Sequence, residues 1–204
     1  MSVFDRYYEK YDDWYNENKF AYLSELQALE KVIPKFGKGL EIGVGTGRFA
    51  QALGIDSGID PSMEMLKIAV RRGVKVCYGF GESLPFLSGG FDYAAIIISL
   101  CFVNESLKVL QESHRVLNKN GRIIIGIVDK DSFLGKFYQK KKSIFYKKAN
   151  FFSVKEVEKM LDNSGFQKFE YYQTLFNLPS KMTAVDKPLK GYGRGGFVVI
   201  SGKK

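Results

Sequence analysis

Cysteine and histidine are scarce in this chain of 204 residues, which holds two cysteines and a single histidine. Cys77 and Cys101 lack the spacing of a metal site or of a disulfide framework, so we predict no bound metal. No charged segment followed by an apolar stretch opens the chain, as a secretory signal would. These absences predict a reduced, cytoplasmic protein.

Long hydrophobic runs are also absent. The longest, Ala94–Ile98, has the length of a strand, whereas a membrane span requires about 20 apolar residues. Internal repeats and low-complexity segments are missing as well. We therefore predict no membrane partner and, from the length, a single domain covering residues 1–204.

Positive charge is unevenly distributed. The net charge is +9, and residues 101–204 hold 20 Lys and Arg against 9 Asp and Glu, while residues 1–100 hold 11 against 13. Six of the lysines fall within residues 136–148, among aromatic residues. This asymmetry indicates either a solvated basic face or a surface for an anionic partner.

Three alternating glycines, Gly43, Gly45 and Gly47, follow a short apolar strand and precede a helix. Glycine in a helix or strand lowers stability by about 0.5–1 kcal/mol relative to alanine. Three glycines within five residues therefore indicate a sharp turn or a closely approaching ligand. Glu41 lies at the carboxyl end of the strand, where open α/β sheets bind ligands, and can accept a bond from an ammonium group. A tight turn without a ligand is the alternative.

The glycine spacing favours one kind of ligand. A dinucleotide-binding fold requires Gly-x-Gly-x-x-Gly, but here the third glycine, Gly47, comes one residue early, which disfavours a nicotinamide-dependent reductase. With Glu41 ahead of it, the run resembles motif I of the class I S-adenosylmethionine-dependent methyltransferases, acidic-x-Gly-x-Gly-x-Gly. This resemblance implies S-adenosyl-L-methionine as the cofactor.

An acidic residue ends the next predicted strand, Ile55–Ile59. Asp60 lies 19 residues after Glu41, where an acidic side chain can accept bonds from both ribose hydroxyls. Pro61 is predicted to open the following helix, Met63–Arg72, at its first turn. Asp60 could instead cap that helix, and the two roles are compatible.

The third strand, Val74–Tyr78, leads into a loop that sharpens the resemblance. Leu84-Pro85-Phe86, followed by Phe91-Asp92, resembles the type-11 methyltransferase subfamily, which includes quinone-biosynthesis C-methyltransferases. In that family an aspartate often meets the adenine amino group at the position where this chain has Phe80. Gly81 and Glu82 are then expected at the adenine edge, with Phe80 packed on the ring or in the core.

The apolar segment Tyr93–Ser99 is typical of a central strand that helices cover on both faces. By the resemblance, Ser99 to Phe102 follow it over the methyl donor, and Ser99 belongs to the cofactor site. The Asn/Asp-Pro-Pro-aromatic run of the amino-methylating nucleic-acid enzymes is absent, which argues against N6-adenine chemistry.

The segment Glu105–Leu117 is predicted to be an amphipathic helix that Gly121 stops, before a strand over Arg122–Val128. The family's helix signature is matched by Glu112, Arg115 and Gly121. His114 lies within this helix, where we expect a structural or solvated role rather than that of a general base.

Residues 1–31 are predicted to be helical, with aromatic residues at spacings of three and four. Such a stripe is usually core packing. In similar methyltransferases, however, an N-terminal helical segment closes the cofactor cleft, and Tyr11 and Trp14 are our candidates for that lid. By the same resemblance, residues 129–152 cover the substrate.

The remaining elements complete a fold prediction. Ser153 and Glu156 match a capping box, and two strands are predicted near Gln167–Phe176 and Phe197–Ser201. The order of elements resembles the α/β, Rossmann-like methyltransferase fold: a seven-stranded, mostly parallel sheet of order 3-2-1-4-5-7-6, whose last strand is antiparallel, with helices on both faces.

The resemblance implies methyl transfer from S-adenosylmethionine to a small-molecule acceptor, and the lysines of residues 136–148 would suit an anionic one. An RNA methyltransferase that uses this basic surface, and a non-catalytic S-adenosylmethionine-binding protein, are the alternatives. Orienting the nucleophile and the methyl group supplies about 7–11 kcal/mol of the barrier without an obligatory base, so we nominate no catalytic residue. The acceptor atom (oxygen, nitrogen or carbon) and the oligomeric state are left open.

Overall fold

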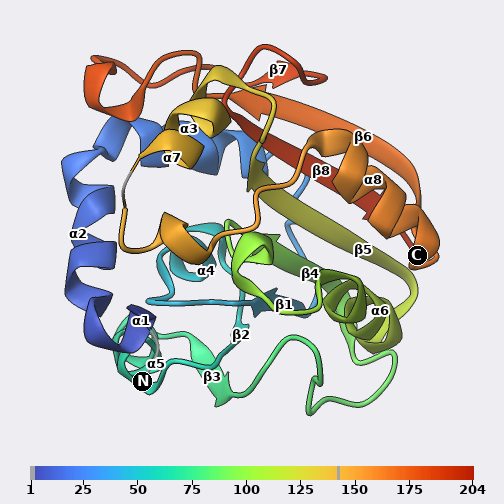
Figure 1. Cartoon of the computed structure of the whole chain (residues 1–204). Coiled ribbons are helices and arrows are strands. Elements are labelled where there is room, and N and C mark those ends of the chain that lie inside the picture. Colours follow the sequence, from blue (N-terminus) through green and yellow to red (C-terminus); the bar gives the residue numbers. More distant parts are fainter. Residues whose placement is uncertain (1–2, 142) are drawn as a thin grey trace.

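A mixed sheet forms the centre of the computed structural model, which describes residues 3–141 and 143–204. Within those residues the sheet has eight strands in the order β3-β2-β1-β4-β5-β8-β6-β7 (Figure 1). The strands are β1 Gly39–Ile42, β2 Ser57–Asp60, β3 Lys75–Tyr78, β4 Phe91–Ile97, β5 Leu117–Val128, β6 Gln167–Thr174, β7 Leu189–Lys190 and β8 Phe197–Lys203.

The predicted strand order is confirmed, with one addition. Strands β1 to β5 are parallel, and β8 pairs antiparallel with both β5 and β6, which gives the expected 3-2-1-4-5-7-6 arrangement when β8 is counted seventh. The additional strand is β7, which has two residues and pairs with Tyr172 and Gln173 at the outer edge of β6. A strand this short carries no periodic signal in the sequence.

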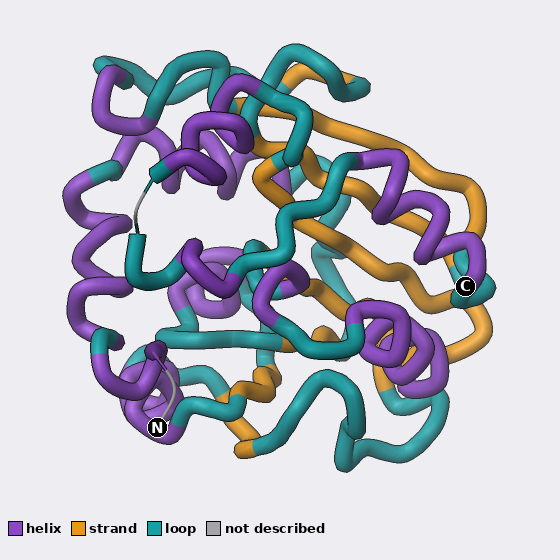
Figure 2. Tube along the Cα trace, viewed as in Figure 1, coloured by secondary structure: helices purple, strands orange, loops and turns teal. Residues whose placement is uncertain are grey.

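Helices cover both faces of the sheet, so that the strands run between them in Figure 2. The α-helices are α1 Val3–Arg6, α2 Tyr8–Glu17, α3 Lys19–Leu29, α4 Arg48–Leu53, α5 Met63–Arg71, α6 Ser106–Val116, α7 Phe133–Lys140 and α8 Val154–Asn163. Three short 3₁₀ turns are η1 Leu100–Phe102, η2 Tyr146–Lys148 and η3 Pro179–Lys181. None of the helices in the described ranges is long and apolar enough to cross a membrane.

Alternation along the central strand β4 builds two cores. Tyr93, Ala95 and Ile97 pack with apolar residues of α3, α4 and α5 on one face, whereas Ala94 and Ile96 pack with those of α6 and α8 on the other. All five side chains are buried, as expected for a parallel strand with helices on both sides. The carboxyl ends of β1, β2 and β4 therefore meet at one edge of the sheet, where the glycine loop also lies.

The structure corrects two predicted helix boundaries. The N-terminal helical stretch breaks at Asn18, whose side-chain amide donates to the carbonyl of Trp14 (2.9 Å) and so competes with the backbone ladder. Helix α6 ends at Val116, one residue before the predicted end at Leu117, because Leu117 already pairs with Phe91 as the first residue of β5. Gly121, the predicted helix stop, lies within β5. The strand and not the glycine therefore terminates this helix.

Two residues of the family's helix signature anchor the loop before β4. The guanidinium of Arg115 donates to the carbonyls of Leu84 (2.9 Å) and Phe86 (2.8 Å) and to Glu112. Glu112 in turn accepts the backbone N–H of Leu84 (2.8 Å). These bonds fix the Leu-Pro-Phe segment against α6 and so determine where the preceding loop, with Gly81 and Glu82, is held.

Candidate functional site

The three glycines of the β1–α4 loop all have positive φ, at 75°, 52° and 78° for Gly43, Gly45 and Gly47. Their surroundings differ. A Cβ on Gly43 would collide with the side chain of Ser99, and a Cβ on Gly47 would lie 3.0 Å from Ala69 of α5. These two glycines are thus required by packing within the protein as well as by backbone conformation.

Gly45 is the member of the three that has room beside it. The nearest atoms to a Cβ built there are Met65 Sδ at 3.5 Å and Tyr11 Cε1 at 4.0 Å, both ordinary contacts. The space over Gly45 is therefore bounded by α5 on one side and by the Tyr11 ring on the other. A ligand can approach the backbone here without displacing the packed ends of the loop.

Glu41 lies just before this loop and is almost fully buried, with 1% of its surface exposed. Burial raises the pKa of its carboxyl well above the ordinary value, although a hydrogen bond from the backbone N–H of Ala50 lowers it. The other carboxylate oxygen, Oε2, has no hydrogen-bond partner among the described residues. An unsatisfied buried acceptor beside an open glycine backbone fits a ligand that brings an ammonium group.

Asp60, at the end of β2, connects the glycine loop to the next helix. Its carboxylate accepts the backbone N–H groups of Gly45 (2.9 Å) and Ser62 (2.8 Å). A carboxylate has about four acceptor positions, so two are left for ribose hydroxyls. Burial raises the pKa of Asp60, while these two backbone bonds lower it.

The alternative that Asp60 caps α5 is wrong. Ser62 is the N-cap, and its hydroxyl accepts the N–H of Met65 (3.4 Å). Pro61 consequently lies outside the helix, one residue before the cap, and not in the first turn as predicted. It still fixes the direction in which the chain leaves β2.

The two residues predicted at the adenine edge, Gly81 and Glu82, both have contacts within the protein. Gly81 is buried, and a Cβ there would lie 2.9 Å from Ile42 and 3.1 Å from Val109, so this glycine is demanded by core packing. The carboxylate of Glu82 accepts the N–H of Asn104 (3.0 Å) and so holds the segment before α6. Their predicted contacts with adenine stay predictions.

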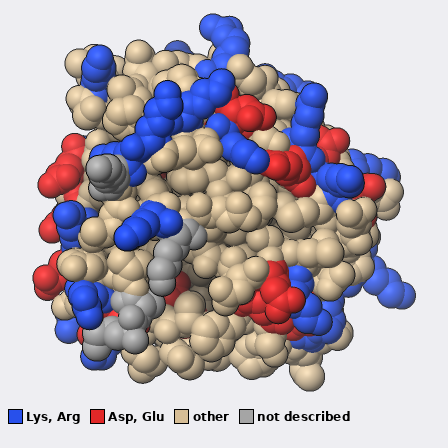
Figure 3. Space-filling model, in the orientation of Figure 1, with Lys and Arg blue, Asp and Glu red and all other residues tan. Residues whose placement is uncertain are grey.

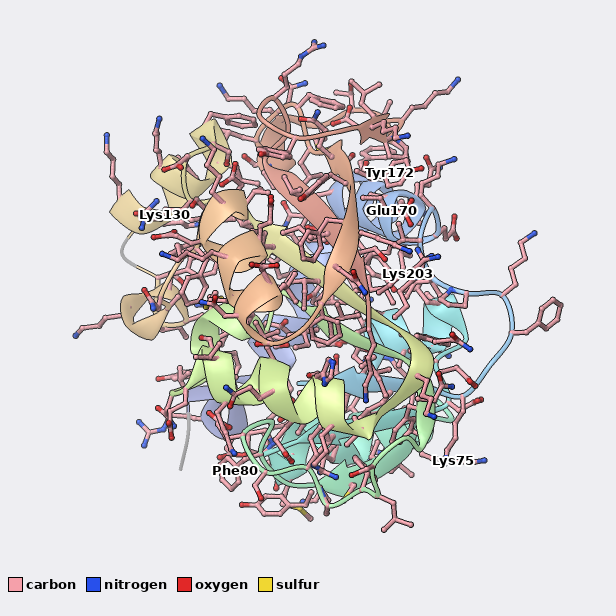
Figure 4. All side chains as sticks on the ribbon, turned by 90° about the vertical axis from the view of Figure 1, so that its right-hand side faces the viewer. Lys75, Phe80, Lys130, Glu170, Tyr172 and Lys203 are labelled. Atoms are coloured by element: carbon pink, nitrogen blue, oxygen red, sulfur yellow. The ribbon has the colours of Figure 1, made fainter. Side chains whose placement is uncertain are left out.

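Phe80 does not lie in the core, which was one of its two predicted roles. Its side chain is 52% exposed and meets the ring of Tyr78 edge-on, with 6.2 Å between centroids. Figure 4 places it at the lower edge of the molecule, close to β3. An exposed aromatic face at this position is available to stack on a planar ligand.

Helix α2 is bound to the glycine loop through Asp12. The carboxylate of Asp12 accepts two bonds each from Arg48 (2.9 and 2.7 Å) and Arg72 (2.9 and 2.8 Å). It also accepts the hydroxyl of Thr46 (2.6 Å), which lies between the second and third glycines. Burial raises the pKa of Asp12, but the bonds from Arg48, Arg72 and Thr46 outweigh it and hold the pKa well below the ordinary value.

The predicted lid and the predicted substrate cover meet above the end of β4. Phe4 of α1 packs on Phe102 (4.9 Å between centroids) and stacks on Phe145 (5.7 Å). Tyr11 also contacts Phe145, edge-on at 5.7 Å. Aromatic residues of the first fifteen positions thus touch a segment more than 120 residues away.

A pocket of about 600 Å³ lies beneath this contact. Its walls come from α2, α3, α7, the segment 143–146 and the carboxyl ends of β4, β5 and β6, most of which lie together on the left side of Figure 1. Tyr11 and Trp14, the two lid candidates, both line it. The volume is in the usual range for a small-molecule site.

Two wall residues, Ile98 and Leu175, adopt positive φ angles of 60° and 58°. For a residue other than glycine this conformation is strained, and for the β-branched Ile98 particularly so. Ile98 directly follows β4, and Leu175 directly follows β6. Such strain concentrates at functional sites, which agrees with the position of the pocket at the strand ends.

The lysines of residues 136–148 lie mainly on the outer side of this cover. Lys136, Lys140, Lys141 and Lys147 are exposed, and Lys141 also borders the pocket. Lys142 and the side chain of Lys148 lie outside what the structure describes. Figure 3 shows Lys and Arg side chains gathered above a mostly uncharged central area of this face.

His114 lies far from these features, on α6 near the amino end of β5. Its ring packs edge-on against Phe166 (5.2 Å between centroids), and burial lowers its pKa. This position is at the opposite edge of the sheet from the glycine loop. A structural role, as expected from the sequence, accounts for it.

The sequence reasoning missed Asp12 and Glu25. Both are acidic residues within aromatic or apolar helical stretches, which is a signal that could have been used, because a charge on a buried helix face requires a partner. Glu25 lies on α3 and is 1% exposed at the pocket wall. Its Oε2 has no hydrogen-bond partner among the described residues.

Comparisons with known proteins agree with this geometry. Residues 40–125 match the family model described as "Methyltransferase domain", type 11. A crystal structure from Thermotoga maritima, described as a SAM-dependent methyltransferase and possible histamine N-methyltransferase, is similar over 99% of this chain and 98% of that chain, with 46% identity and a TM-score of 0.97.

Two curated relatives add to the picture. An uncharacterized protein of Methanocaldococcus jannaschii is 52% identical over the full length of both chains. A demethylmenaquinone methyltransferase of Thermotoga maritima is 30% identical over 61% of this chain and 59% of its own length. With the glycine loop, Glu41 and Asp60 arranged as described, the chain belongs to the type-11 family of S-adenosylmethionine-dependent methyltransferases, and S-adenosylmethionine is its cofactor.

Proposed function

We propose that this protein transfers the methyl group of S-adenosylmethionine to a small molecule held in the pocket beneath α2 and α7. The supporting observation is the position of Tyr11, which bounds the space over Gly45 with one part of its ring and lines the pocket as well. The cofactor space and the pocket therefore adjoin. A methyl donor on the glycine loop would present its reactive end to whatever occupies the pocket.

The chain's own residues act by binding and orientation. Glu41 and Asp60 would hold the amino-acid and ribose parts of the cofactor, whose sulfonium supplies an electrophilic methyl group. The lid and the aromatic cover exclude water from the pocket and restrict the acceptor to a few orientations. Orientation of this kind accounts for about 7–11 kcal/mol in favourable cases.

An RNA acceptor is the second candidate, and the exposed lysines of the cover favour it. The aromatic side chains of the cover, however, mostly face one another: Tyr138 packs on Tyr146 at 4.7 Å between centroids and Tyr146 on Phe151 at 5.6 Å. These three rings are thus engaged rather than free to stack on bases, whereas Phe133 and Phe137 of α7 are exposed. A small-molecule acceptor accounts for both the pocket and the aromatic residues that line it.

A labelling experiment tests the proposal. Purified protein is mixed with methyl-labelled S-adenosylmethionine and a cell extract, which is then separated into small-molecule, RNA and protein fractions. We expect label in the small-molecule fraction, absent with the Gly45→Val protein. Label in a ribonuclease-sensitive fraction would assign the acceptor to RNA, and no label in any fraction would indicate a binding protein without transferase activity.

A salt titration provides an independent check on RNA. Binding of tRNA that weakens steeply between two salt concentrations reports neutralised phosphates. The variant Lys136→Glu/Lys140→Glu/Lys147→Glu alters only the exposed face and spares the pocket residue Lys141. Tight wild-type binding that this variant abolishes would contradict the small-molecule proposal.

A further inference from the structure

Glu25 is a buried carboxylate that the protein does not satisfy. Its side chain borders the pocket, the residue is 1% exposed, and Oε2 has no hydrogen-bond partner among the described residues. A buried charge without a partner is unfavourable by several kcal/mol, and proteins retain such groups mainly where a ligand supplies the partner.

Glu25 shares the pocket lining with Tyr11, Tyr15, Tyr138 and Tyr146, and burial, together with the charge of Glu25, raises the pKa of each of these hydroxyls. The hydroxyls bond to one another in pairs. Tyr11 and Tyr15 share a hydrogen bond of 2.9 Å between their hydroxyl oxygens, and Tyr138 bonds to Tyr146. The pKa of Glu25 is raised well above its ordinary value by burial, with no hydrogen bond to offset it. These tyrosines thus line the same pocket as the carboxylate, and none of them donates a hydrogen bond to its Oε2.

The same tyrosines offer aromatic surfaces to the pocket. Tyr138 and Tyr146 lie with 4.7 Å between ring centroids at an interplanar angle of 30°, and Tyr11 and Trp14 form the wall supplied by α2. A cation within about 6 Å of such a face is attracted by the ring quadrupole, more strongly where water is excluded. Aromatic walls around one carboxylate are suited to an ammonium group.

The charge at the pocket boundary also favours a cation. Three acidic residues of α2 line it, namely Glu9, Asp13 and Glu17, against the lysines Lys10 and Lys141. Together with Glu25, the described part of the lining is therefore net acidic, although the chain as a whole is basic. The basic face of the cover and the acidic pocket are different surfaces, and the pocket is the one that encloses a ligand.

We infer that the pocket binds a protonatable amine, whose ammonium group pairs with the carboxylate of Glu25 inside the ring of tyrosines. This inference rests on the proposed function, because it names the chemical class of the acceptor in the same pocket. It departs from the expectation of an anionic acceptor, which was drawn from the lysines of residues 136–148 alone.

Matched ligands test the inference by calorimetry. Each amine is paired with an alcohol of the same skeleton: 2-phenylethylamine with 2-phenylethanol, tryptamine with tryptophol, and butylamine with butanol, while 3-phenylpropanoate serves as the anion. Titrations are made with and without S-adenosylhomocysteine. We expect at least one amine to bind about tenfold or more tightly than its alcohol, a ratio equivalent to about 1.4 kcal/mol.

Two variants locate the effect. Glu25→Gln keeps the shape and removes the charge, and should reduce the amine-to-alcohol ratio to near one while leaving the binding of S-adenosylhomocysteine unchanged. Glu30→Gln makes the same change at an exposed residue directly after α3, outside the residues that line the pocket, and should preserve the ratio. If Glu25→Gln fails to fold, the wild-type ratios decide by themselves.

Several results would overturn the inference: amines and alcohols that bind equally, the anion binding best, or a ratio that survives Glu25→Gln. Failure of the proposed function is a separate result, because it appears as absent binding of S-adenosylhomocysteine or absent product. An amine preference that depends on Glu25 would hold in either case.

Discussion

Removing the carboxylate of Asp12 tests whether the N-terminal lid controls cofactor binding. Asp12 accepts five hydrogen bonds, four from the two guanidinium groups of Arg48 and Arg72 and one from Thr46. Thr46 belongs to the glycine loop, and Arg48 begins α4. The variant Asp12→Asn keeps the shape of the side chain but leaves two adjacent arginines without their shared counterion.

The magnitude follows from burial. Loss of one partner from a fully buried ion pair costs about 3–5 kcal/mol. The side chain of Asp12 is 15% exposed and those of Arg48 and Arg72 are 15% and 20% exposed, so solvent screens part of this. We take about 2–3 kcal/mol, equivalent to a factor of roughly 30 to 150 in the closed-to-open ratio of the lid.

The expected result is weaker cofactor binding, because only the closed arrangement holds the loop in place. Apparent affinity falls with the population of the competent state. In calorimetry, the affinity of the variant for S-adenosylhomocysteine should fall by about tenfold or more, and by no more than the change of roughly 30 to 150 in the closed-to-open ratio. Hydrogen exchange of the backbone amides of α2 should become faster. Asp13→Asn is the matched control, since it makes the same charge change on an exposed neighbour for which no hydrogen bond is seen.

The pH dependence of this latch has a definite sign. The pKa of Asp12 is lowered in the folded protein, so its contribution is complete above the ordinary value of about 3.9 and is lost as the pH falls through the lower folded value. Protection of α2 should therefore persist at pH 5. The reasoning is refuted if Asp12→Asn and Asp13→Asn give the same affinity and the same exchange in α2.

Three further predictions concern the cofactor loop and the buried acid. Gly45→Val should abolish binding of S-adenosylhomocysteine by filling the open space. Gly54→Val, at another positive φ with no neighbour within 4 Å, should lower stability and leave binding intact. Calorimetry measures the binding and thermal unfolding the stability, and binding by both variants would contradict the prediction. Asp60→Asn should weaken binding by about 1–3 kcal/mol and remove the preference for S-adenosylhomocysteine over its 2′-deoxyribose analogue, and an unchanged preference would refute ribose recognition. The pKa of Glu25 is raised in the folded protein, so stability is lost as the pH rises above the ordinary glutamate pKa of about 4.3. Glu25→Gln should therefore have a higher melting temperature than wild type at pH 7, with a smaller difference at pH 4. A difference in melting temperature that does not change with pH would contradict this.

Local spacing in the sequence was sufficient to predict the glycine turn and the two acidic strand ends beside it. Gly43, Gly45 and Gly47 predicted a strand-to-helix turn because no other residue adopts three positive φ angles within five positions at low cost. Glu41 and Asp60 end neighbouring parallel strands, so chain order alone brings them to one edge of the sheet. The strand order came from the resemblance of the element order to the methyltransferase fold, and the structure confirms it.

The pocket in which we propose that the acceptor binds was decided by tertiary structure. The pocket joins Tyr11 of α2, Glu25 of α3, Tyr138 of α7 and Leu175 after β6, which are separated by up to 164 positions along the chain. The lysines of residues 136–148 suggested an anionic ligand because their number is visible in the sequence, whereas the direction in which each side chain points is not. Burial of Glu25 arises only in the folded chain, since desolvation depends on every neighbour in space and not on the neighbours in sequence.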